Sequence, residues 1–208
     1  MPESKEQAIL EAAIHEFAEK GFEQASTNQI ARMANTSKGL IFHYFESKEK
    51  LFEACVRHTI DFTMKELDYE NWPMTQRIID DLKIYFEKEL TFMKKYPDFY
   101  SLVIRAFADP PGDLRKKMTE LYAELDSISR TYFSKMIDKL NLKEDVDTDT
   151  LGAVVESHMD YYEKRAMAYM KRHQDASMEE MKPFFDQFLA MLSMSLRGLV
   201  KNDEDVLK

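Results

Sequence analysis

Hydrophobic residues recur at helical spacing in almost every long segment of the chain. In the first segment Ile9, Ala13 and Phe17 share one face. The charged residues that fall on its other faces are Glu6, Glu16 and Glu19. The pattern predicts helices over residues 4–20, 27–34, 38–44, 47–67, 74–95, 97–108, 112–140, 148–173 and 178–201. We therefore expect an all-α fold.

Breaks between these segments carry the residues that end helices. Gly21 follows the first segment, and it is expected at the helix end because glycine enters the left-handed region without steric cost. Pro97, the Pro110-Pro111-Gly112 cluster and the polar run 141–150 separate later segments. Residues 201–208 are expected to form a frayed tail.

Composition narrows the class of protein. The 208 residues are 44% hydrophobic and 32% charged, as in globular proteins, and are enough for one large or two small domains. With 5 Gly and 6 Pro, an all-β fold and a glycine-rich phosphate loop are disfavoured. One cysteine, Cys55, excludes a disulfide framework and the usual thiolate zinc sites. No apolar stretch approaches ~18 residues and the N-terminus has no apolar signal region, so we expect no membrane association and a cytoplasmic location.

The charge distribution favours one small basic region. The net charge is −9, which argues against non-specific coating of nucleic acid or anionic lipid. Residues 26–50 differ from the rest of the first fifty, because four cations oppose only two glutamates there. A local DNA-reading surface is therefore compatible with the acidic chain.

Residues 27–48 have the pattern of a helix-turn-helix. Thr27, Ser37 and Ser47 each suit a helix N-cap, because their hydroxyls can accept a backbone N–H. Ala31 is small enough for the helix crossing, and Asn35 tolerates the positive φ that the turn requires.

The second helix of this motif has two chemically different faces. Ile41, Phe42 and Phe45 are expected to be buried. The opposite face carries Lys38, Gly39, Leu40, His43 and Tyr44. Base edges and phosphates in a major groove can be contacted by such a set of groups: a cation, an exposed backbone, an apolar side chain and two polar rings.

These residues resemble the TetR family of bacterial transcriptional regulators. The resemblance covers about residues 5–55 and is carried by Ala8-Ile9-Leu10-Glu11-Ala12-Ala13, Phe17-Ala18-Glu19-Lys20-Gly21-Phe22, Ala25-Ser26-Thr27-Asn28-Gln29-Ile30-Ala31 and the run from Ser37 to Leu51. Three positions depart from the family pattern: Asn35 stands where Gly is usual, Thr36 where Val is usual, and Phe42 where Tyr is frequent.

The resemblance implies a three-helix DNA-binding domain over residues 1–50 and a helical effector-binding and dimerisation domain over 51–208. The implied DNA contacts are Thr27, Ser37, Lys38, Gly39, Leu40, His43, Tyr44 and Lys48. Four of them would hold phosphates: Thr27, Ser37, Tyr44 and Lys48. The others would face base edges or nearby backbone. The alternative is that Thr27 and Ser37 serve only as helix caps, and that Lys38, His43 and Lys48 belong to an ordinary solvent-exposed face.

An effector pocket is implied among the later helices. Its expected lining is Trp72, Phe86, Met93, Phe107, Tyr122, His158, Met159 and Tyr162, with Tyr85 and Phe99 as further candidates. The alternative is that all of these are core residues, and that His158 is a core histidine with a satisfied hydrogen bond. Arg105 could hold an anionic head group or pair with Asp109. The charge of the effector therefore stays open, and a lipophilic molecule is expected.

The last helix is apolar nearly all round, so one face needs a partner. The resemblance implies a homodimer through the last two helices, which would place two recognition helices one DNA turn apart on a palindromic operator. The helix that begins at Ser47 would couple effector to operator, most simply as a repressor that the effector releases.

No enzymatic chemistry stands out. The chain has no pair of Glu-x-x-His motifs, no H-E-x-x-H and no G-x-S-x-G, so neither a di-iron bundle nor a common hydrolase is indicated. We expect a non-enzyme without cofactor or metal. The alternative function is a helical interaction protein, or a bundle that binds small molecules but not DNA.

Overall fold

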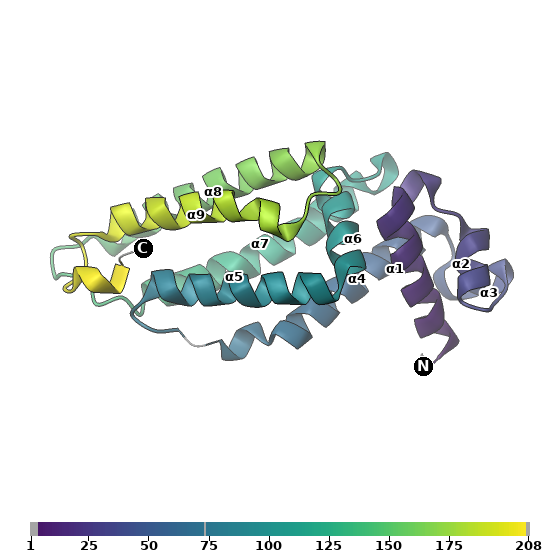
Figure 1. Cartoon of the computed structure of the whole chain (residues 1–208), viewed down its shortest axis with the longest axis horizontal. Coiled ribbons are helices and arrows are strands. Elements are labelled where there is room, and N and C mark those ends of the chain that lie inside the picture. The colour runs from purple at the N-terminus through teal and green to yellow at the C-terminus, as the bar shows by residue number, and fades with distance from the viewer. Residues whose placement is uncertain (1–3, 73, 207–208) are drawn as a thin grey trace. The chain divides into compact units, whose positions relative to one another are not determined.

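The computed structural model describes residues 4–72 and 74–206, and all of its regular elements there are helices (Figure 1). The α-helices are α1 (Lys5–Gln24), α2 (Thr27–Met33), α3 (Lys38–Phe45), α4 (Lys48–Leu67), α5 (Ile78–Lys95), α6 (Pro97–Ala108), α7 (Arg115–Ile137), α8 (Thr148–Arg172) and α9 (Met178–Leu196). Short 3-10 turns are η1 (Tyr69–Asn71), η2 (Gly112–Leu114) and η3 (Asp203–Val206). The predicted all-α fold is confirmed.

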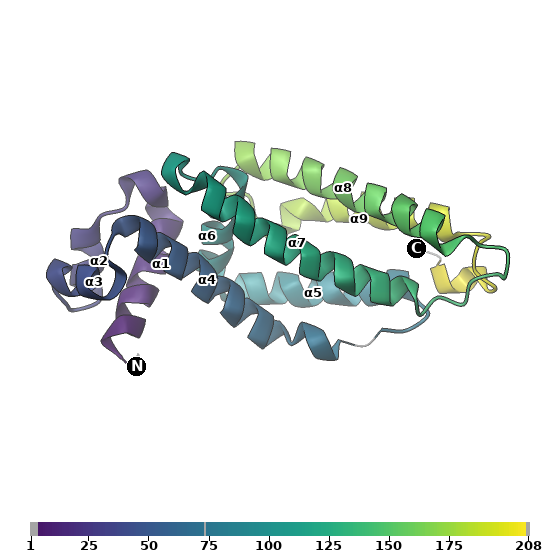
Figure 2. The ribbon, with the colours of Figure 1, turned by 180° about the vertical axis from the view of Figure 1, so that it is seen from behind.

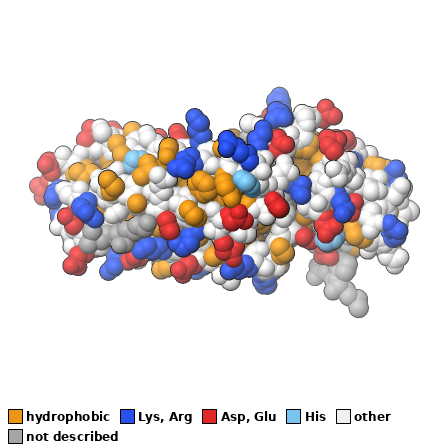
Figure 3. Space-filling model, turned by 45° about the horizontal axis from the view of Figure 1, so that its top comes forward, with side chains coloured by type: hydrophobic (Ala, Val, Ile, Leu, Met, Phe, Trp, Pro, Cys, Tyr) orange, Lys and Arg blue, Asp and Glu red, His pale blue; other side chains and the backbone are white. Residues whose placement is uncertain are grey.

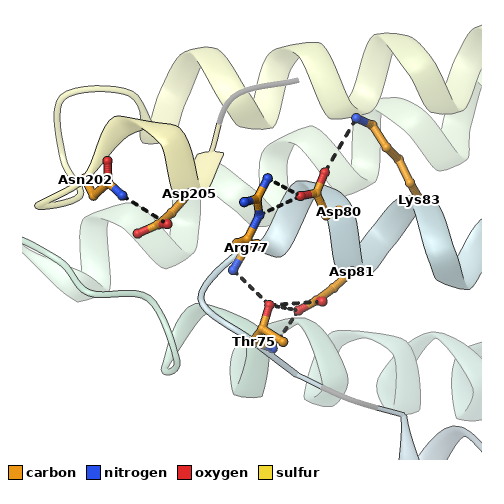
Figure 4. A network of polar contacts seen from close by, with 7 residues as sticks. All are labelled: Thr75, Arg77, Asp80, Asp81, Lys83, Asn202 and Asp205. Atoms are coloured by element: carbon orange, nitrogen blue, oxygen red, sulfur yellow. Dashed lines mark hydrogen bonds and ion pairs between the residues drawn. The ribbon is translucent and has the colours of Figure 1, made fainter.

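Helix α5 begins later than the periodicity predicted, at Ile78 instead of residue 74. The buried carboxylate of Asp81 explains the difference, because it accepts hydrogen bonds from the backbone N–H of Thr75 at 2.6 Å and from the Thr75 hydroxyl (Figure 4). The Thr75 hydroxyl in turn accepts the N–H of Arg77 at 3.0 Å. These bonds hold residues 75–77 in a turn ahead of the helix.

The C-terminal end differs from the predicted frayed tail. Helix α9 ends at Leu196, and Gly198 then adopts a positive φ of 82°. The chain pairs with the segment before α8, because Lys201 N donates to Asn141 O at 2.8 Å. Val206 is fully buried. The prediction of fraying is therefore wrong for residues 201–206, and residues 207–208 lie outside the described part.

Contacts divide the chain into two compact units. The first unit contains residues 1–68 and 93–120, and the second contains residues 69–92 and 121–208. The predicted functional division after residue 50 stays a prediction.

Aromatic packing joins α1 to α4 within the first unit. Helix α1 packs against α2, α4 and α6. Phe17 and Phe52 are fully buried and meet edge to face, with ring centroids 5.0 Å apart. Phe22, just after the positive-φ Gly21, meets Phe52 at 5.3 Å. Burying one such ring stabilises the fold by about 1.5–3 kcal/mol.

Two polar contacts hold the end of α1. Glu16, expected on an outer face, is only 6% exposed, and its Oε1 accepts the backbone N–H of Ser26 at 3.0 Å. The sequence expectation for Glu16 is thus wrong, because the start of α2 supplies a partner for the buried carboxylate. Arg105 of α6 donates to the carbonyl of Ala18 at 2.9 Å.

In the second unit, α8 packs against α9. Helices α5 and α7 run alongside them in both ribbon views (Figure 2). Its core includes Leu151, Val155 and Met159 of α8 with Leu189 and Leu192 of α9. Phe86 stacks on Phe185 with centroids 4.3 Å apart. Among the described residues, no helix is long and apolar enough to cross a membrane.

Candidate nucleic-acid interface and ligand-binding region

The helix-turn-helix comprises α2 and α3, and both begin at serine caps. Ser26 caps α2 by accepting the N–H of Gln29, so Thr27 is the first helical residue. The predicted cap at Thr27 is wrong by one position, which leaves its hydroxyl out of the cap. Ser37 and Ser47 cap α3 and α4 by accepting backbone N–H groups at 3.1 Å, as predicted.

The turn between the helices has the predicted conformation at Asn35, whose φ is 46°. Backbone hydrogen bonds close it, from Thr36 N to Ala31 O at 2.9 Å and from Asn35 N to Arg32 O at 3.2 Å. Ala31 is buried, as the helix crossing requires. Lys5 of α1 donates to the carbonyl of Asn35 at 3.2 Å, which ties the turn to the first helix.

Helix α3 presents a polar outer face. Ile41 and Phe45 are buried, whereas Lys38, Gly39, His43 and Tyr44 are exposed and Leu40 is half-buried. Phe42 is also half-buried, so its predicted burial is only partial. The Lys38 ammonium lies 5.6 Å from the Phe42 ring centroid, within the range of a cation–π contact.

Neither the packing around Gly39 nor its backbone conformation requires a glycine at this position. A Cβ added there would meet only the Ser37 hydroxyl, at 3.8 Å, an ordinary contact distance. Gly39 also has no positive φ, unlike Gly21 and Gly198. Within the protein alone an alanine would therefore fit.

Lys48 is engaged inside the first unit. Its ammonium donates to the carbonyl of Glu23 at 3.3 Å and lies 4.8 Å from the Phe22 ring centroid. These contacts place its charge at the junction of the N-terminus of α4 and the end of α1. They are compatible with a phosphate contact, which stays a prediction.

The residues predicted to line an effector pocket are divided between the units. Met93, Phe107 and the further candidate Phe99 belong to the first unit, and the others to the second. In the second unit Trp72, Phe86 and Met159 are buried, whereas Tyr122, His158 and Tyr162 are half-buried. Trp72 contacts Tyr85, Phe86 stacks on Phe185, and Tyr122 donates to Glu163. Phe86 and Tyr162 share Phe185 as a neighbour, and the role of the six residues in binding stays a prediction.

His158 and Arg105 both have defined polar contacts within the protein. His158 Nε2 lies 2.7 Å from the hydroxyl of Ser195, and burial lowers the pKa of the imidazole. This pairing accounts for a neutral His158 without any ligand. Arg105 donates to the carbonyls of Ala18 and Glu19 at 2.9 and 3.4 Å, so its guanidinium serves the end of α1.

Glu89 is a functional candidate that sequence reasoning missed. Its Oε1 accepts a hydrogen bond from the Tyr69 hydroxyl at 2.8 Å. Burial raises the pKa of both groups. The signal was present in the sequence, because Glu89 follows Tyr85 and Phe86 by four and three residues and so shares their apolar face.

A second missed group links α7 to α8. Arg130 donates to Asp126 and Asp160, both at 2.8 Å, and lies 3.7 Å from Glu163. Burial, with the charge of Asp126, raises the pKa of Glu163 to about 7. Within residues 4–72 and 74–206, no group of three or more His, Cys, Asp or Glu side chains could hold a metal ion.

The outer face of α8 and α9 is rich in uncharged side chains. Val154 and Tyr161 of α8 are exposed at helical spacing, and Met194 of α9 is 76% exposed. Arg165 bridges the two helices by donating to the Tyr161 hydroxyl at 3.0 Å and to Gln187 at 2.6 Å. Figure 3 shows hydrophobic side chains gathered over these helices between charged ones.

Comparisons with known proteins agree with this geometry. Residues 9–55 match the family model described as bacterial regulatory proteins, tetR family. The transcriptional repressor AcnR of Corynebacterium efficiens is 29% identical over 170 residues, covering 79% of this chain and 82% of AcnR. The regulator RutR of Escherichia coli is 39% identical over 64 residues, covering 31% and 30% of the two chains.

Solved structures show the same fold. The fatty acid degradation regulator FadR of Bacillus halodurans has a TM-score of 0.62 at 16% identity, over 87% of this chain and 96% of FadR. FadR of Bacillus subtilis in complex with stearoyl-CoA has a TM-score of 0.61 at 16% identity, over 87% and 96%. A regulator from Streptomyces coelicolor has a TM-score of 0.62 at 20% identity, over 97% and 84%.

Proposed function

The chain belongs to the tetR family of bacterial regulatory proteins, and on that premise we propose that it is a repressor released from a palindromic operator by a small lipophilic effector. It is a helix-turn-helix transcriptional regulator. We propose in addition the DNA-contact roles of individual residues, a homodimer and a response to an effector.

The outer face of α3 is the observation that carries the proposal. Lys38, His43 and Tyr44 point to solvent while Ile41 and Phe45 anchor the helix from behind. Gly39 exposes backbone among them without an internal need for glycine. Glycine lowers helix stability by up to ~1 kcal/mol relative to alanine, so close approach of a DNA duplex is a reason for its presence.

Residues around this face of α3 would contact DNA phosphates. The Thr27 hydroxyl is outside the α2 cap, and Ser37 and Tyr44 lie at the start and on the outer side of α3. Lys48 lies in the first turn of α4, where the helix dipole also favours an anion. With so few cations we expect modest non-specific affinity, which falls with salt at a slope of about −0.9 per phosphate contact.

A second copy of the chain would cover the outer face of α8 and α9. The exposed side chains Val154, Tyr161 and Met194 form a largely uncharged surface there. A stable interface needs about 800 Å² from each partner, and two long helices can supply that area. Twofold symmetry would set the two copies of α3 about 34 Å apart, one turn of DNA.

The effector would act through α4, which lies in the first unit and leads along the chain into the second. Helix α4 begins beside the DNA-binding residues and ends at Leu67, two residues before Tyr69 of the second unit. Its displacement would change the spacing of the two α3 helices. A coupling of ~1–3 kcal/mol, or about 5–150-fold, is typical of allosteric proteins and would suffice here.

The test is binding to DNA selected from a random pool, followed by fluorescence anisotropy on the selected duplex. We expect wild-type protein and Lys164→Ala, an exposed control on α8, to bind equally, and Lys38→Ala to lose at least ~tenfold in affinity. If no sequence is enriched and all three proteins bind alike, the chain is instead a helical interaction or ligand-binding protein.

A further inference from the structure

The two helices of the helix-turn-helix are too short to fix their own orientation. Helix α2 has 7 residues and α3 has 8. An isolated helix shorter than ~12–15 residues is only marginally stable in water, so neighbouring elements must set its direction. Helix α1, with 20 residues, packs against both. It is therefore the element in which side chains that position the DNA-reading residues are expected.

One charged side chain of α1 holds the start of α2. The Glu16 carboxylate is 6% exposed, and its Oε1 accepts the backbone N–H of Ser26 at 3.0 Å. Ser26 is also the N-cap of α2, because its hydroxyl accepts the N–H of Gln29. A buried carboxylate costs free energy unless it is hydrogen-bonded, so this contact is expected to persist. Glu16 therefore fixes the residue directly before Thr27.

A second charged side chain of α1 holds the other end of α2. Lys5 lies in the first turn of α1, and its Nζ donates to the carbonyl of Asn35 at 3.2 Å. Asn35 has a φ of 46°, which residues other than glycine seldom adopt. A charged donor makes a stronger hydrogen bond than a neutral one. Lys5 therefore supports the turn that leads to Ser37, the cap of α3.

The spacing of the two contacts along α1 matches the length of α2. Glu16 follows Lys5 by 11 positions, which is about 16 Å at the helical rise of 1.5 Å per residue. Asn35 follows Ser26 by 9 positions, or about 14 Å at the same rise. Because each contact joins α1 to a different end of α2, the short helix cannot swivel about either of them.

Both contacts lie next to predicted DNA contacts without belonging to them. Ser26 precedes Thr27, and Asn35 lies two positions before Ser37. The Glu16 side chain is too buried to reach a duplex. Groups that bind a ligand must be held to within about 0.5 Å by supporting hydrogen bonds. A loose end of α2 would therefore displace the DNA-reading face.

We propose that Glu16 and Lys5 are positioning residues for DNA binding, which act through Ser26 and Asn35 and do not contact the duplex. The inference rests on the proposed function, because it concerns the same DNA-reading face. Loss of either side chain loosens α2, while the outer face of α3 keeps its chemistry. Affinity for the selected sequence then falls, and the number of phosphate contacts stays the same.

Amide hydrogen exchange tests the Glu16 contact in the protein without DNA. Glu16→Met keeps the side-chain length but removes the acceptor, so the Ser26 amide should exchange at least about tenfold faster than in wild type. Glu16→Gln keeps an acceptor oxygen and should exchange at nearly the wild-type rate. Glu19→Met, at an exposed glutamate of α1, is the matched control. Unchanged exchange at Ser26 in Glu16→Met would overturn the proposal.

Fluorescence anisotropy on the selected duplex tests the effect on DNA binding. We expect Glu16→Met to lose at least about tenfold in affinity relative to Glu19→Met, at the same salt slope. Glu16→Gln should stay within about threefold of wild type, because it retains the acceptor. Thermal unfolding checks that each variant is folded. Equal affinity of Glu16→Met and its control, or an equal loss in Glu16→Gln, would contradict the role of the acceptor.

Lys5 keeps the test decisive if Glu16→Met does not fold, because the lysine side chain is exposed. Lys5→Met should lose at least about threefold in affinity at an unchanged salt slope, and exchange should quicken at Thr36, whose N–H closes the turn. Lys5→Arg retains a charged donor and should bind like wild type. Lys20→Met is the exposed control. A salt slope reduced by about 0.9 in Lys5→Met would reveal a direct phosphate contact and overturn the positioning role.

The behaviour of wild-type protein keeps the two proposals separate. If wild type enriches no DNA sequence, the proposed repressor function fails, whatever the exchange rates of the variants. If wild type binds its selected DNA and both methionine variants bind like their controls, the regulator assignment stands and the positioning role of Glu16 and Lys5 fails.

Discussion

The guanidinium of Arg105 donates a hydrogen bond from Nε to the carbonyl oxygen of Ala18 at 2.9 Å. A second bond reaches the carbonyl of Glu19 at 3.4 Å. These carbonyls lie in the last turn before Gly21, where the regular helix of α1 is interrupted. Helix α6 therefore supplies donors that the broken helix end lacks.

Removing this side chain should weaken the first unit. We expect Arg105→Ala to lower the free energy of unfolding by about 1–3 kcal/mol, because the part-buried carbonyl of Ala18 and the exposed carbonyl of Glu19 lose a charged donor. Urea denaturation measures this change. Arg115→Ala, an exposed arginine of α7, is the control and should stay within ~0.5 kcal/mol of wild type. Equal stability of the two variants would show that the contact adds nothing.

Gly39→Ala should move stability and DNA affinity in opposite directions. The added Cβ meets only an ordinary contact at 3.8 Å, so the helix should gain a few tenths to ~1 kcal/mol. The same methyl group would obstruct close approach of a duplex and weaken binding to selected DNA. Thermal unfolding and anisotropy on one preparation measure both effects. Unchanged DNA affinity would place Gly39 outside the interface.

Substitutions of Lys48 and Leu40 should have different effects on DNA binding, one on overall affinity and the other on base preference. Lys48→Ala should weaken binding to every sequence alike and reduce the salt slope by about 0.9, because a phosphate contact is lost. Leu40→Ala should mainly alter which bases are preferred. Titrations at several salt concentrations on selected and unrelated duplexes separate these effects, and the reverse pattern would mean that the two roles are exchanged.

Glu163 should make folding stability depend on pH. Its neighbours are Tyr122, Asp126 and Arg130 on α7 and Asp160 on α8, and its pKa is raised from 4.5 to about 7. Between these values the folded chain holds a proton that the unfolded chain has lost, so stability falls as pH rises across the window.

Glu163→Gln should flatten that slope and be more stable above pH 7 by on the order of 1 kcal/mol, because its partial exposure screens the effect. Urea unfolding at pH 5, 6, 7 and 8 measures this. Glu156→Gln, an exposed control on the same helix, should retain the wild-type slope. An unchanged slope in Glu163→Gln would assign the pH dependence to other groups.

Met194→Asp should separate the proposed dimer. Met194 is 76% exposed on the outer face of α9, and a carboxylate buried there by a partner would lack a counter-charge. Sedimentation at micromolar concentration should give a dimer for wild type and a monomer for the variant. Met33→Asp, at an exposed methionine of the first unit, is the control. A wild-type monomer would remove the basis for twofold operator binding.

The elements that sequence predicted well depend on local chemistry. Ser37 and Ser47 cap helices through bonds to residues three positions away, and Asn35 takes its positive φ within one tight turn. Local hydroxyl and backbone preferences are sufficient at such positions. The sequence places the cap of α2 one residue late because Ser26 and Thr27 are adjacent and chemically alike.

The features that sequence missed depend on partners far along the chain. Glu16 is buried where it accepts the N–H of Ser26, and Glu89 is half-buried where Tyr69, twenty residues away, donates to it. Val206 is buried after the chain turns at Gly198. Hydrophobic periodicity assigns each residue to a helix face, but it does not identify the distant residue that forms a hydrogen bond with a buried carboxylate.

The central claim is that two copies of α3 read DNA in twofold symmetry. Hydroxyl-radical footprinting of wild-type protein on its selected duplex tests this directly. We expect two protected half-sites in inverted orientation, with centres about 10 base pairs apart on one face of the duplex. A single protected half-site, or uniform protection without sequence dependence, would contradict it.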